Sequence, residues 1–316
     1  MLVDKLLEID ANAVNGSVFP HEDHYWLVGN DSYNRRETYL YVLSADFQLT
    51  GERTFLARHF EDHRVVSNQE TCHVWCNFSG GAAMHYGELD SSSRSLHATK
   101  IRPEKFVPKR LEKNWCPFVR NGEIFLVYSF YPQLVILKKR GRNIHEKIFS
   151  EKSSYFHSWV AENLDLSKVK HVGGGSNLVK YRGFYVGTFH VKSLGVEYSS
   201  YMVFLTPDHV VKSIVEIDYG ETVFEGERLA RLKKELDEDE TGLFWAAGYR
   251  RKLKKVAFTT GIFLKNGKFH ISLGINDLVT KLALIGVEKI DDIIDDISRR
   301  PSPSPLWIVP SVWQGS

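Results

Sequence analysis

The chain has 316 residues, of which 43% are hydrophobic and 25% are charged, and these proportions are ordinary for a globular protein. Its formal net charge of +2 gives no bulk attraction to nucleic acid or to a membrane surface, and no apolar run is long enough to span a bilayer. Aromatic residues reach 13%, which favours sugar binding, because ring faces stack on the C–H faces of pyranoses.

The N-terminus lacks the basic and apolar regions of a signal peptide. The three cysteines are an odd number without zinc-like spacing, and Cys72 and Cys76 fall on one face of a predicted strand. We interpret these two as core thiols. We therefore expect a reducing compartment, most simply a cytoplasmic location.

Three units of similar plan occupy the first half of the chain. Each begins with a polar cluster, continues into an aromatic or β-branched strand, and ends in a return strand. The cluster, strand and return strand of each unit are residues 15–18, 25–28 and 39–43, then 61–64, 73–78 and 84–89, then 112–118, 123–129 and 134–137. In the third unit, Asn121-Gly122 is a strong hairpin signal, because both residues tolerate a positive φ.

Two more units follow, with clusters at residues 173–176 and 259–261 and strands at 184–190 and 268–273. Between these units, residues 225–240 are highly charged, and Leu229, Leu232 and Leu236 fall at near-helical spacing. This segment is predicted to form a helical or irregular excursion. We interpret the basic run at 250–255, which follows it, as a solvated loop or strand edge rather than an anion site.

The last part of the chain differs from the repeated units. Val287, Ile290, Ile294 and Ile297 have the spacing of a short C-terminal helix. Residues 301–316 form a Pro/Ser-rich tail, which we expect to be loosely ordered or packed by Trp307 and Trp313.

Five copies of one unit, spaced by about 50–60 residues except at the charged excursion, predict an all-β fold, a five-bladed β-propeller. We assign residues 1–300 to this single domain. The aromatic strands are predicted to be the innermost strands, so that the five polar clusters converge at one mouth. A β-sandwich is the alternative, but its turn signals recur every ~8–12 residues without this longer period.

Several common sites are absent from the sequence. No GxGxxG motif follows a strand, and there is no Walker loop, GxSxG elbow or Asp-x-Asp motif. His73, His85 and His97 are scattered without metal-ligand spacing. The sequence therefore predicts no metal site and no cofactor.

The polar clusters supply carboxylates and cations instead. Asp62, between Glu61 and the basic pair His63-Arg64, could serve as a general acid. Lys113 could bind an anion as a point charge, and Arg64 could bind one through two parallel hydrogen bonds from its guanidinium group. Purely structural roles stay open as alternatives: residues 61–64 could form a turn with a local ion pair, and Lys113 could be a surface lysine.

Two further candidates lie at strand ends. His190 ends the strand of the fourth unit, and Asp277 follows that of the fifth. A satisfied core histidine is the alternative for His190, and an Asx-turn or helix cap is the alternative for Asp277.

The order of these clusters resembles that in the five-bladed propeller family of β-1,2-mannoside phosphorylases and related β-mannosyltransferases. The most specific match is Glu112-Lys113-Asn114-Trp115-Cys116-Pro117-Phe118, which is similar to the Glu-Lys-Asn-Trp-x-Pro-Phe form of one branch. The weaker matches are Asn15-Gly16-Ser17-Val18 to Asn-Pro-Ser-Ile, residues 61–64 to Glu-Asp-Pro-Arg, residues 173–176 to Gly-Gly-(Ser/Thr)-Pro, His190 to a strand-end His, and residues 274–277 to Gly-x-x-Asp.

This resemblance implies roles for individual residues. It implies that Asp62 is the general acid and that Arg64, Lys113 and His190 bind phosphate. It further implies that Asn15, Ser17, Asn114 and Asp277 bind the substrate. The sequence departs from the family pattern at His63, which replaces a Pro, and at Asn30, which stands where an Arg is expected, with Arg35 and Arg36 nearby.

We therefore predict a carbohydrate-active enzyme, an inverting glycoside phosphorylase or glycosyltransferase that acts on β-mannosides or a similar sugar in an oligosaccharide or glycan. Inorganic phosphate or a sugar nucleotide is the expected co-substrate. Three alternatives stay open: a catalytically impaired sugar-binding propeller, a propeller that serves as a protein-interaction platform, and a glycoside hydrolase. The hydrolase needs a second carboxylate, for which Glu61 and Glu112 are candidates.

Overall fold

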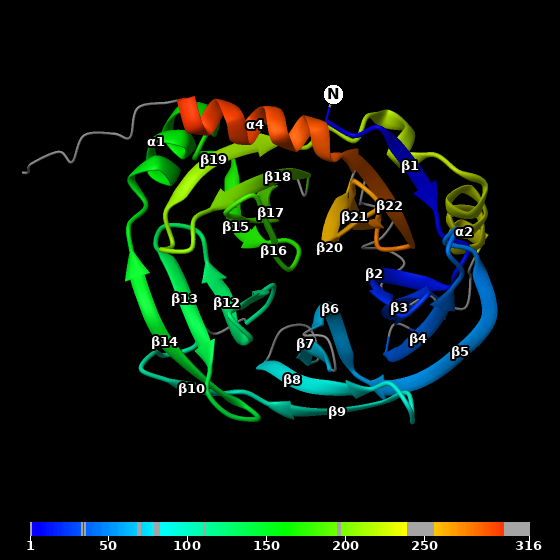
Figure 1. Cartoon of the computed structure of the whole chain (residues 1–316). Helices are drawn as coiled ribbons and strands as arrows, with labels where there is room; N and C mark the ends of the chain where they lie inside the picture. Colours follow the sequence, from blue (N-terminus) through cyan, green and yellow to red (C-terminus); the bar gives the residue numbers. More distant parts are fainter. Residues whose placement is uncertain are drawn as a thin grey trace, which may run out of the picture.

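The computed structural model describes residues 2–32, 34, 36–67, 71–78, 83–109, 112–194, 197–238 and 256–299. Their strands form five sheets arranged around a central axis (Figure 1). Each sheet is one blade of a propeller, so the predicted five-bladed β-propeller is confirmed.

The strands of each blade run outward from the axis and pair antiparallel, apart from β10 in blade III. Blade I is β2 (Ala13–His21), β3 (His24–Asp31), β4 (Glu37–Leu43) and β5 (Leu49–Arg58), and blade II is β6 (Phe60–Ser67), β7 (Cys72–Phe78), β8 (Ala83–Asp90) and β9 (Ser95–Lys100). Blade III is β11 (Cys116–Arg120), β12 (Glu123–Ser129), β13 (Leu134–Lys139) and β14 (Ile144–Glu151), with β10 (Arg102–Glu104) parallel to β14. Blade IV is β15 (Val169–Gly174) and β16 (Val179–Tyr181), then β17 (Phe184–Ser193), β18 (Tyr198–Leu205) and β19 (Val211–Glu216), and blade V is β20 (Ala257–Lys265), β21 (Lys268–Ile275), β22 (Val279–Gly286) and β1 (Lys5–Glu8).

The innermost strands are β2, β6, β11, β15 with β16, and β20, which contain or directly follow the polar clusters. The prediction that the aromatic strands are innermost was therefore wrong. The aromatic strands are the second strands of their blades, counted from the axis. Five strands that converge on an axis leave room for small and polar side chains. The Oγ1 atom of Thr260 in β20 donates a hydrogen bond of 2.6 Å to the carbonyl of Gly16 in β2 there. The large rings pack between neighbouring blades instead.

The hairpin signals of the sequence are confirmed. Asn121 and Gly122 have φ values of 52° and 77°. A second Asn-Gly pair in the sequence, Asn266-Gly267, joins β20 to β21 with φ values of 51° and 67°. These left-handed conformations match the right-handed twist of the strands that they join. Cys72 and Cys76 are buried free thiols, as predicted.

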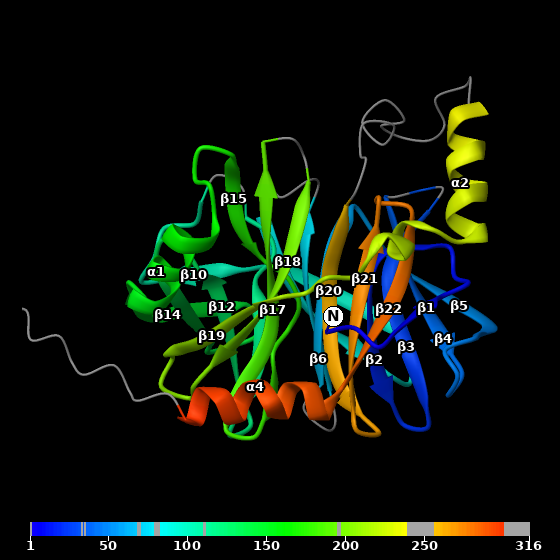
Figure 2. The same ribbon diagram turned by 90° about the horizontal axis from the view of Figure 1, so that it is seen from above.

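Both predicted helical segments are present. The charged excursion forms α2 (Glu227–Glu238), which follows the 3₁₀-helix η1 (Glu221–Phe224) and buries Leu229 and Leu232. The C-terminal helix α4 (Val287–Arg299) crosses the lower face of the ring in Figure 2 and buries Ile290 and Ile294. The helix α1 (Ser154–Asn163), between blades III and IV, was not predicted.

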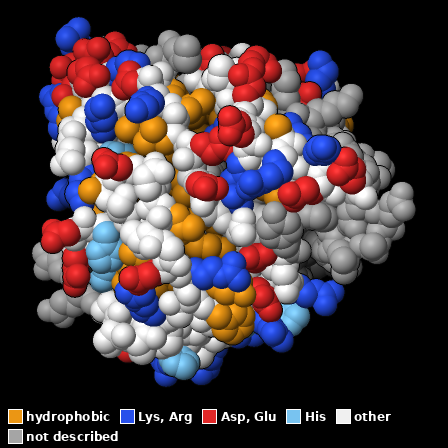
Figure 3. Space-filling model, turned by 90° about the vertical axis from the view of Figure 1, so that its right-hand side faces the viewer, with side chains coloured by type: hydrophobic (Ala, Val, Ile, Leu, Met, Phe, Trp, Pro, Cys, Tyr) orange, Lys and Arg blue, Asp and Glu red, His pale blue; other side chains and the backbone are white. Residues whose placement is uncertain are grey.

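The ring closes through the N-terminal strand. β1 pairs antiparallel with β22, with Lys5 opposite Leu284, so the two ends of the domain share one blade. The outer surface next to β5 and α2 carries interspersed acidic and basic side chains (Figure 3), in keeping with the small net charge.

Some predictions lie outside the described residues. These are the basic run at 250–255, Arg35 and the tail at 301–316. Among the residues that the structure describes, no helix has the length and apolar character needed to cross a membrane.

Candidate functional site

The candidate residues gather at one face of the ring, which we call the top face. It is the face at which the innermost strands begin and the second strands end, and it lies uppermost in Figure 2. Near this face the pairing of the innermost strands is interrupted by register shifts after Val14 in β2, Glu61 in β6 and Thr259 in β20. Such bulges redirect side chains out of the regular pleat.

Asp62 lies at the bulge of β6. Its φ is 52°, a left-handed conformation, and its side chain is half-buried. The Nδ2 atom of Asn77, at the end of β7, donates a hydrogen bond of 2.8 Å to Asp62 Oδ2. Because Asn77 is fully buried, it holds the carboxyl group of Asp62 in a fixed direction.

Arg64 lies on the axis and is fully buried. Its Nη1 atom donates to the carbonyls of Asp62 and His63 at 3.0 and 3.1 Å, its Nη2 atom to Thr259 O at 3.3 Å, and its Nε atom to Gly175 O. A further bond of 3.4 Å joins Nη2 to Asn114 Oδ1. These five bonds match the five N–H donors of a guanidinium group.

Arg64 therefore ties blade II to blades III, IV and V. Burial lowers the pKa of Arg64, and the carboxylate of Asp62 opposes that effect. The side chain of Asn114, a predicted substrate contact, is directed at Arg64, and the contact of Arg64 with phosphate stays a prediction.

Asn15 and Asp277 meet across the junction of blades I and V. Asn15 Nδ2 donates to Asp277 Oδ1 at 2.9 Å. The contact depends on Gly274, because a Cβ atom at that position would lie 1.8 Å from Asn15 Oδ1. Ser17 lies deeper, is 1% exposed and packs against Gly261.

A group of basic side chains, which we call the cationic patch, lies on blades III and IV and consists of Lys113, Lys170, His171 and Lys192. Burial and the neighbouring lysines lower the pKa of His171 from its ordinary value, so the positive charge of the patch comes from the three lysines. The pKa of Lys192 is lowered by burial and by the charges of Lys170 and Lys113, whereas Asp277 acts to raise it. Lys113 and Asp277, which are distant in sequence, thus both act on Lys192 through their charges. Repulsion among the three lysines is relieved when an anion binds between them.

His190 lies beneath the cationic patch. Its Nε2 atom is 3.4 Å from Nε2 of His171, and its ring is buried against Phe258. Burial, followed by the charges of His171, Arg64 and Lys192, holds the pKa of His190 well below its usual range. The imidazole is therefore neutral near pH 7, and it can accept or donate one hydrogen bond at each ring nitrogen.

Glu112 supports the loop that carries Lys113. Its Oε2 atom accepts a bond of 2.9 Å from Trp115 Nε1, and its Oε1 atom accepts bonds from Tyr128 and from the backbone of Lys109. Burial raises the pKa of Glu112. These contacts indicate an anchor for the loop rather than the second carboxylate of a hydrolase.

The structure thus brings Asp62, Arg64, Lys113, His190 and Asp277 to one end of the ring. Sequence reasoning missed Asn77, Lys170, His171 and Lys192. A signal for Lys192 was present, because it lies two residues after His190 and hence on the same face of a strand.

Asn30 is directed at the start of β6. Its Nδ2 atom donates to Phe60 O at 2.5 Å, which places its side chain between blades I and II. Arg36 is exposed, and its carbonyl accepts a bond from His59 N at 2.6 Å.

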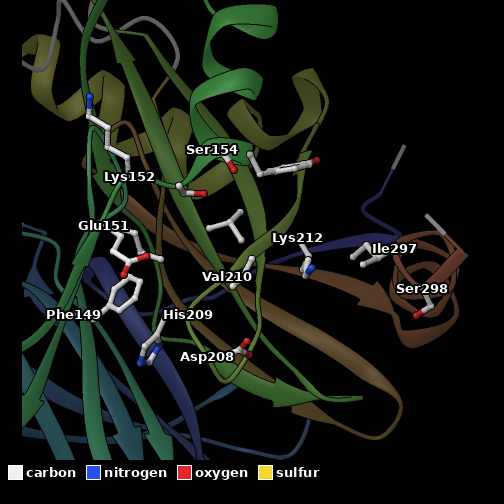
Figure 4. A pocket seen from close by; sticks show the side chains of 14 residues that line it. Phe149, Glu151, Lys152, Ser154, Asp208, His209, Val210, Lys212, Ile297 and Ser298 are labelled. Carbon is white, nitrogen blue, oxygen red and sulfur yellow. The ribbon is translucent and has the colours of Figure 1, made fainter. Parts of the chain in front are cut away.

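A cavity of about 590 Å³ lies elsewhere, between blades III and IV (Figure 4). Its lining includes Phe149, Lys152, His209 and Ile297 but none of the candidate site residues. We therefore do not assign it to the same site.

Neither a known family model nor a curated protein matches the sequence. Solved structures do match the fold. β-1,2-Mannobiose phosphorylase from Listeria innocua, in complex with β-1,2-mannobiose, aligns with a TM-score of 0.58 and 13% identity over 94% of this chain and 95% of that chain. A putative glycoside hydrolase from Bacteroides ovatus aligns with a TM-score of 0.57 and 9% identity, over 88% and 87% of the two chains.

A third structure is a GH43 β-1,3-galactosidase with galactodeoxynojirimycin, which aligns with a TM-score of 0.52 and 11% identity, over 90% and 94% of the two chains. The chain has the fold of these sugar-active propellers. At such identities the match concerns the fold, and the chemistry must be argued from the residues of this chain.

Proposed function

We propose that the protein is a carbohydrate-active enzyme that transfers a glycosyl group, most simply a β-mannosyl group, to or from phosphate with inversion. The observation that supports this proposal is the placement of one oriented carboxyl group, Asp62, at the same end of the ring as the cationic patch and the Asn15–Asp277 pair. An inverting phosphorylase needs one protein carboxyl group, because phosphate is the nucleophile.

In the proposed reaction, Asp62 gives its proton to the glycosidic oxygen while the bond from that oxygen to the anomeric carbon breaks. A phosphate oxygen, held by the cationic patch, attacks the anomeric carbon from the opposite side and forms the new C–O bond. The products are a sugar 1-phosphate and the released sugar. Asp277 and Asn15 would hold hydroxyl groups of the transferred sugar, and Arg64 would keep the inner strands in register beneath it.

The proposed reaction is tested by incubating the protein with β-1,2-mannobiose and inorganic phosphate and by measuring the mannose 1-phosphate that forms. We expect Asp62→Asn to lower kcat by at least about 100-fold, because general acid catalysis contributes ~10²–10⁴-fold. Asp23→Asn, in the exposed β2–β3 turn, is the matched control and should keep wild-type turnover. Full turnover by Asp62→Asn would show that Asp62 is not the acid.

The same assay separates the alternatives. Free mannose that forms without phosphate would indicate a hydrolase, with Asp277 or Glu61 as the second carboxylate. Product from a sugar nucleotide alone would indicate a transferase. Calorimetric binding of mannobiose without any product would indicate a sugar-binding propeller, as the replacement at Asn30 suggests. A cytoplasmic location and the lack of a cofactor stay predictions.

A further inference from the structure

Two histidines of blade IV, His171 in β15 and His190 in β17, form what we call the histidine pair. Their Nε2 atoms are 3.4 Å apart, and the planes of the two rings are 84° apart. Gly173 leaves the space for this contact, because a Cβ atom there would lie 2.7 Å from His190 Nε2 and 3.1 Å from His171 Nε2. One nitrogen of such a pair donates a hydrogen bond and the other accepts it.

The two histidines have different surroundings. His190 is 1% exposed, and its ring centroid is 5.0 Å from that of Phe258 and 5.2 Å from that of Tyr198. His171 is exposed on the surface above it. Because a charge is costly among apolar rings, His171 is the member of the pair that can take a proton from solvent.

Basic side chains surround His171. Lys192 lies directly opposite it in the pairing of β15 with β17. The other charged side chains that act on His171 or on Lys192 are Lys170 on β15, Lys113 and Lys109 on the loop before β11, and Asp277 after β21. Burial, followed by the lysine charges, lowers the pKa of His171. Its imidazole is therefore neutral near pH 7.

An anion at the cationic patch changes this balance. A dianion close to His171 favours the charged imidazolium and so raises its pKa, against the effect of the lysines. Both ring nitrogens of the imidazolium are donors. Nε2–H then donates to His190, and Nδ1–H can donate to an oxygen of the anion.

We propose that His171 takes up one proton from solvent when a phosphate dianion binds at the cationic patch, so that the patch binds its anion more tightly as the pH falls. This inference rests on the proposed function. The sign follows from linkage: between the pKa of His171 in the free protein and its raised pKa in the complex, the complex holds more protons. Lowering the pH through that range therefore favours binding.

Calorimetry with sulfate tests this inference, because sulfate keeps its charge of −2 near neutral pH whereas phosphate itself titrates there. The heat of binding is compared at pH 7 in two buffers of different ionisation enthalpy, which gives the number of protons taken up. We expect the wild type to take up about half a proton or more per sulfate, and to bind sulfate about fivefold or more tightly at about pH 6.5 than at about pH 8.

His171→Gln keeps a polar side chain that does not titrate. We expect it to bind sulfate without proton uptake and with less than about a twofold change in affinity over the same pH range. Because His171 is exposed, the variant should unfold at the wild-type midpoint. The matched control is His97→Gln, on the exposed side of β9, which should keep the wild-type proton uptake.

The outcomes are distinct. Sulfate binding by the wild type without proton uptake overturns the role of His171 and leaves the proposed function standing, since that function needs an anion site but no protonation at His171. Unchanged uptake in His171→Gln also overturns the role, because another group then takes the proton. A wild type that binds neither sulfate nor phosphate overturns the anion site of the proposed function and this inference with it.

Discussion

Single residues near the axis are limited by the space between blades, and the glycines of the fourth polar cluster show this most clearly. A Cβ atom on Gly174 would lie 2.0 Å from the carbonyl oxygen of Asn114, and one on Gly175 would lie 2.2 Å from Thr259 Oγ1. We expect Gly174→Ala to lower the free energy of unfolding by ~1–3 kcal/mol, because β15 must move away from blade III. Urea unfolding measures this change.

Gly141→Ala is the matched control for Gly174→Ala. The nearest atom to a Cβ at Gly141 is 3.6 Å away, in the side chain of Ile144. We expect its effect to stay within about 0.5 kcal/mol, as for most surface substitutions. Equal effects of the two variants would contradict the crowding argument.

Residue types and their order allowed several site residues to be named from the sequence. Asp62, Lys113 and Asp277 stand in polar clusters beside strands, and this position predicted that they converge. The role of Arg64 could not be predicted, since its hydrogen bonds reach Asn114, Gly175 and Thr259 on three other blades. Such contacts depend on how blades are placed around the axis, which local patterns do not encode.

Elements that join neighbouring blades give a pH dependence that can be measured. His145 in β14 is fully buried, and its Nε2 atom accepts a hydrogen bond of 3.1 Å from Trp75 Nε1 in β7. Burial lowers the pKa of His145 from 6.5 to about 4. Between these two pKa values the unfolded chain binds more protons than the folded one. The stability that the neutral, buried His145 contributes is therefore complete above pH 6.5 and is lost as the pH falls towards 4.

We expect wild-type stability to fall between pH 7.5 and 4.5, with about 2–3 kcal/mol of that fall due to His145. His145→Asn cannot titrate there, and although it is less stable at pH 7.5, its stability should change less with pH. Guanidinium unfolding at both pH values measures the difference. His97→Asn, on the exposed side of β9, is the control and should keep the wild-type dependence. An unchanged dependence in His145→Asn would contradict the assignment.

At the scale of strands and turns, pairs of turn residues located the hairpins correctly, because a positive φ is a local property. The order of strands from the axis was not predictable in the same way. An aromatic strand between two blades and an innermost strand both contain buried residues, and periodicity alone does not distinguish them. The helix α1 was missed because its residues, Ser154–Asn163, lack a strong amphipathic pattern.

The whole molecule depends on the ring being closed by β1. Removal of residues 2–9 exposes the edge of β22 and breaks the four residue pairs that join it to β1. We expect a loss of about 3–5 kcal/mol in the free energy of unfolding, together with self-association. Guanidinium unfolding and size-exclusion chromatography measure the two effects.

Removal of residues 301–316 is the control, because the sequence assigns them to a tail outside the domain. We expect that truncation to leave the unfolding midpoint unchanged. A larger loss from the tail than from the N-terminal residues would contradict both the domain assignment and the importance of ring closure.

The pairing of β1 with β22 has a consequence for the order of events during synthesis. Lys5 leaves the ribosome early, but its partner Leu284 is among the last residues of the ring to emerge. At translation rates of about 5–20 residues per second, β1 waits some tens of seconds for its partner. Blades I–IV can form as they emerge, whereas blade V can be completed only after translation of β22, so the nascent chain carries an unpaired strand for most of its synthesis.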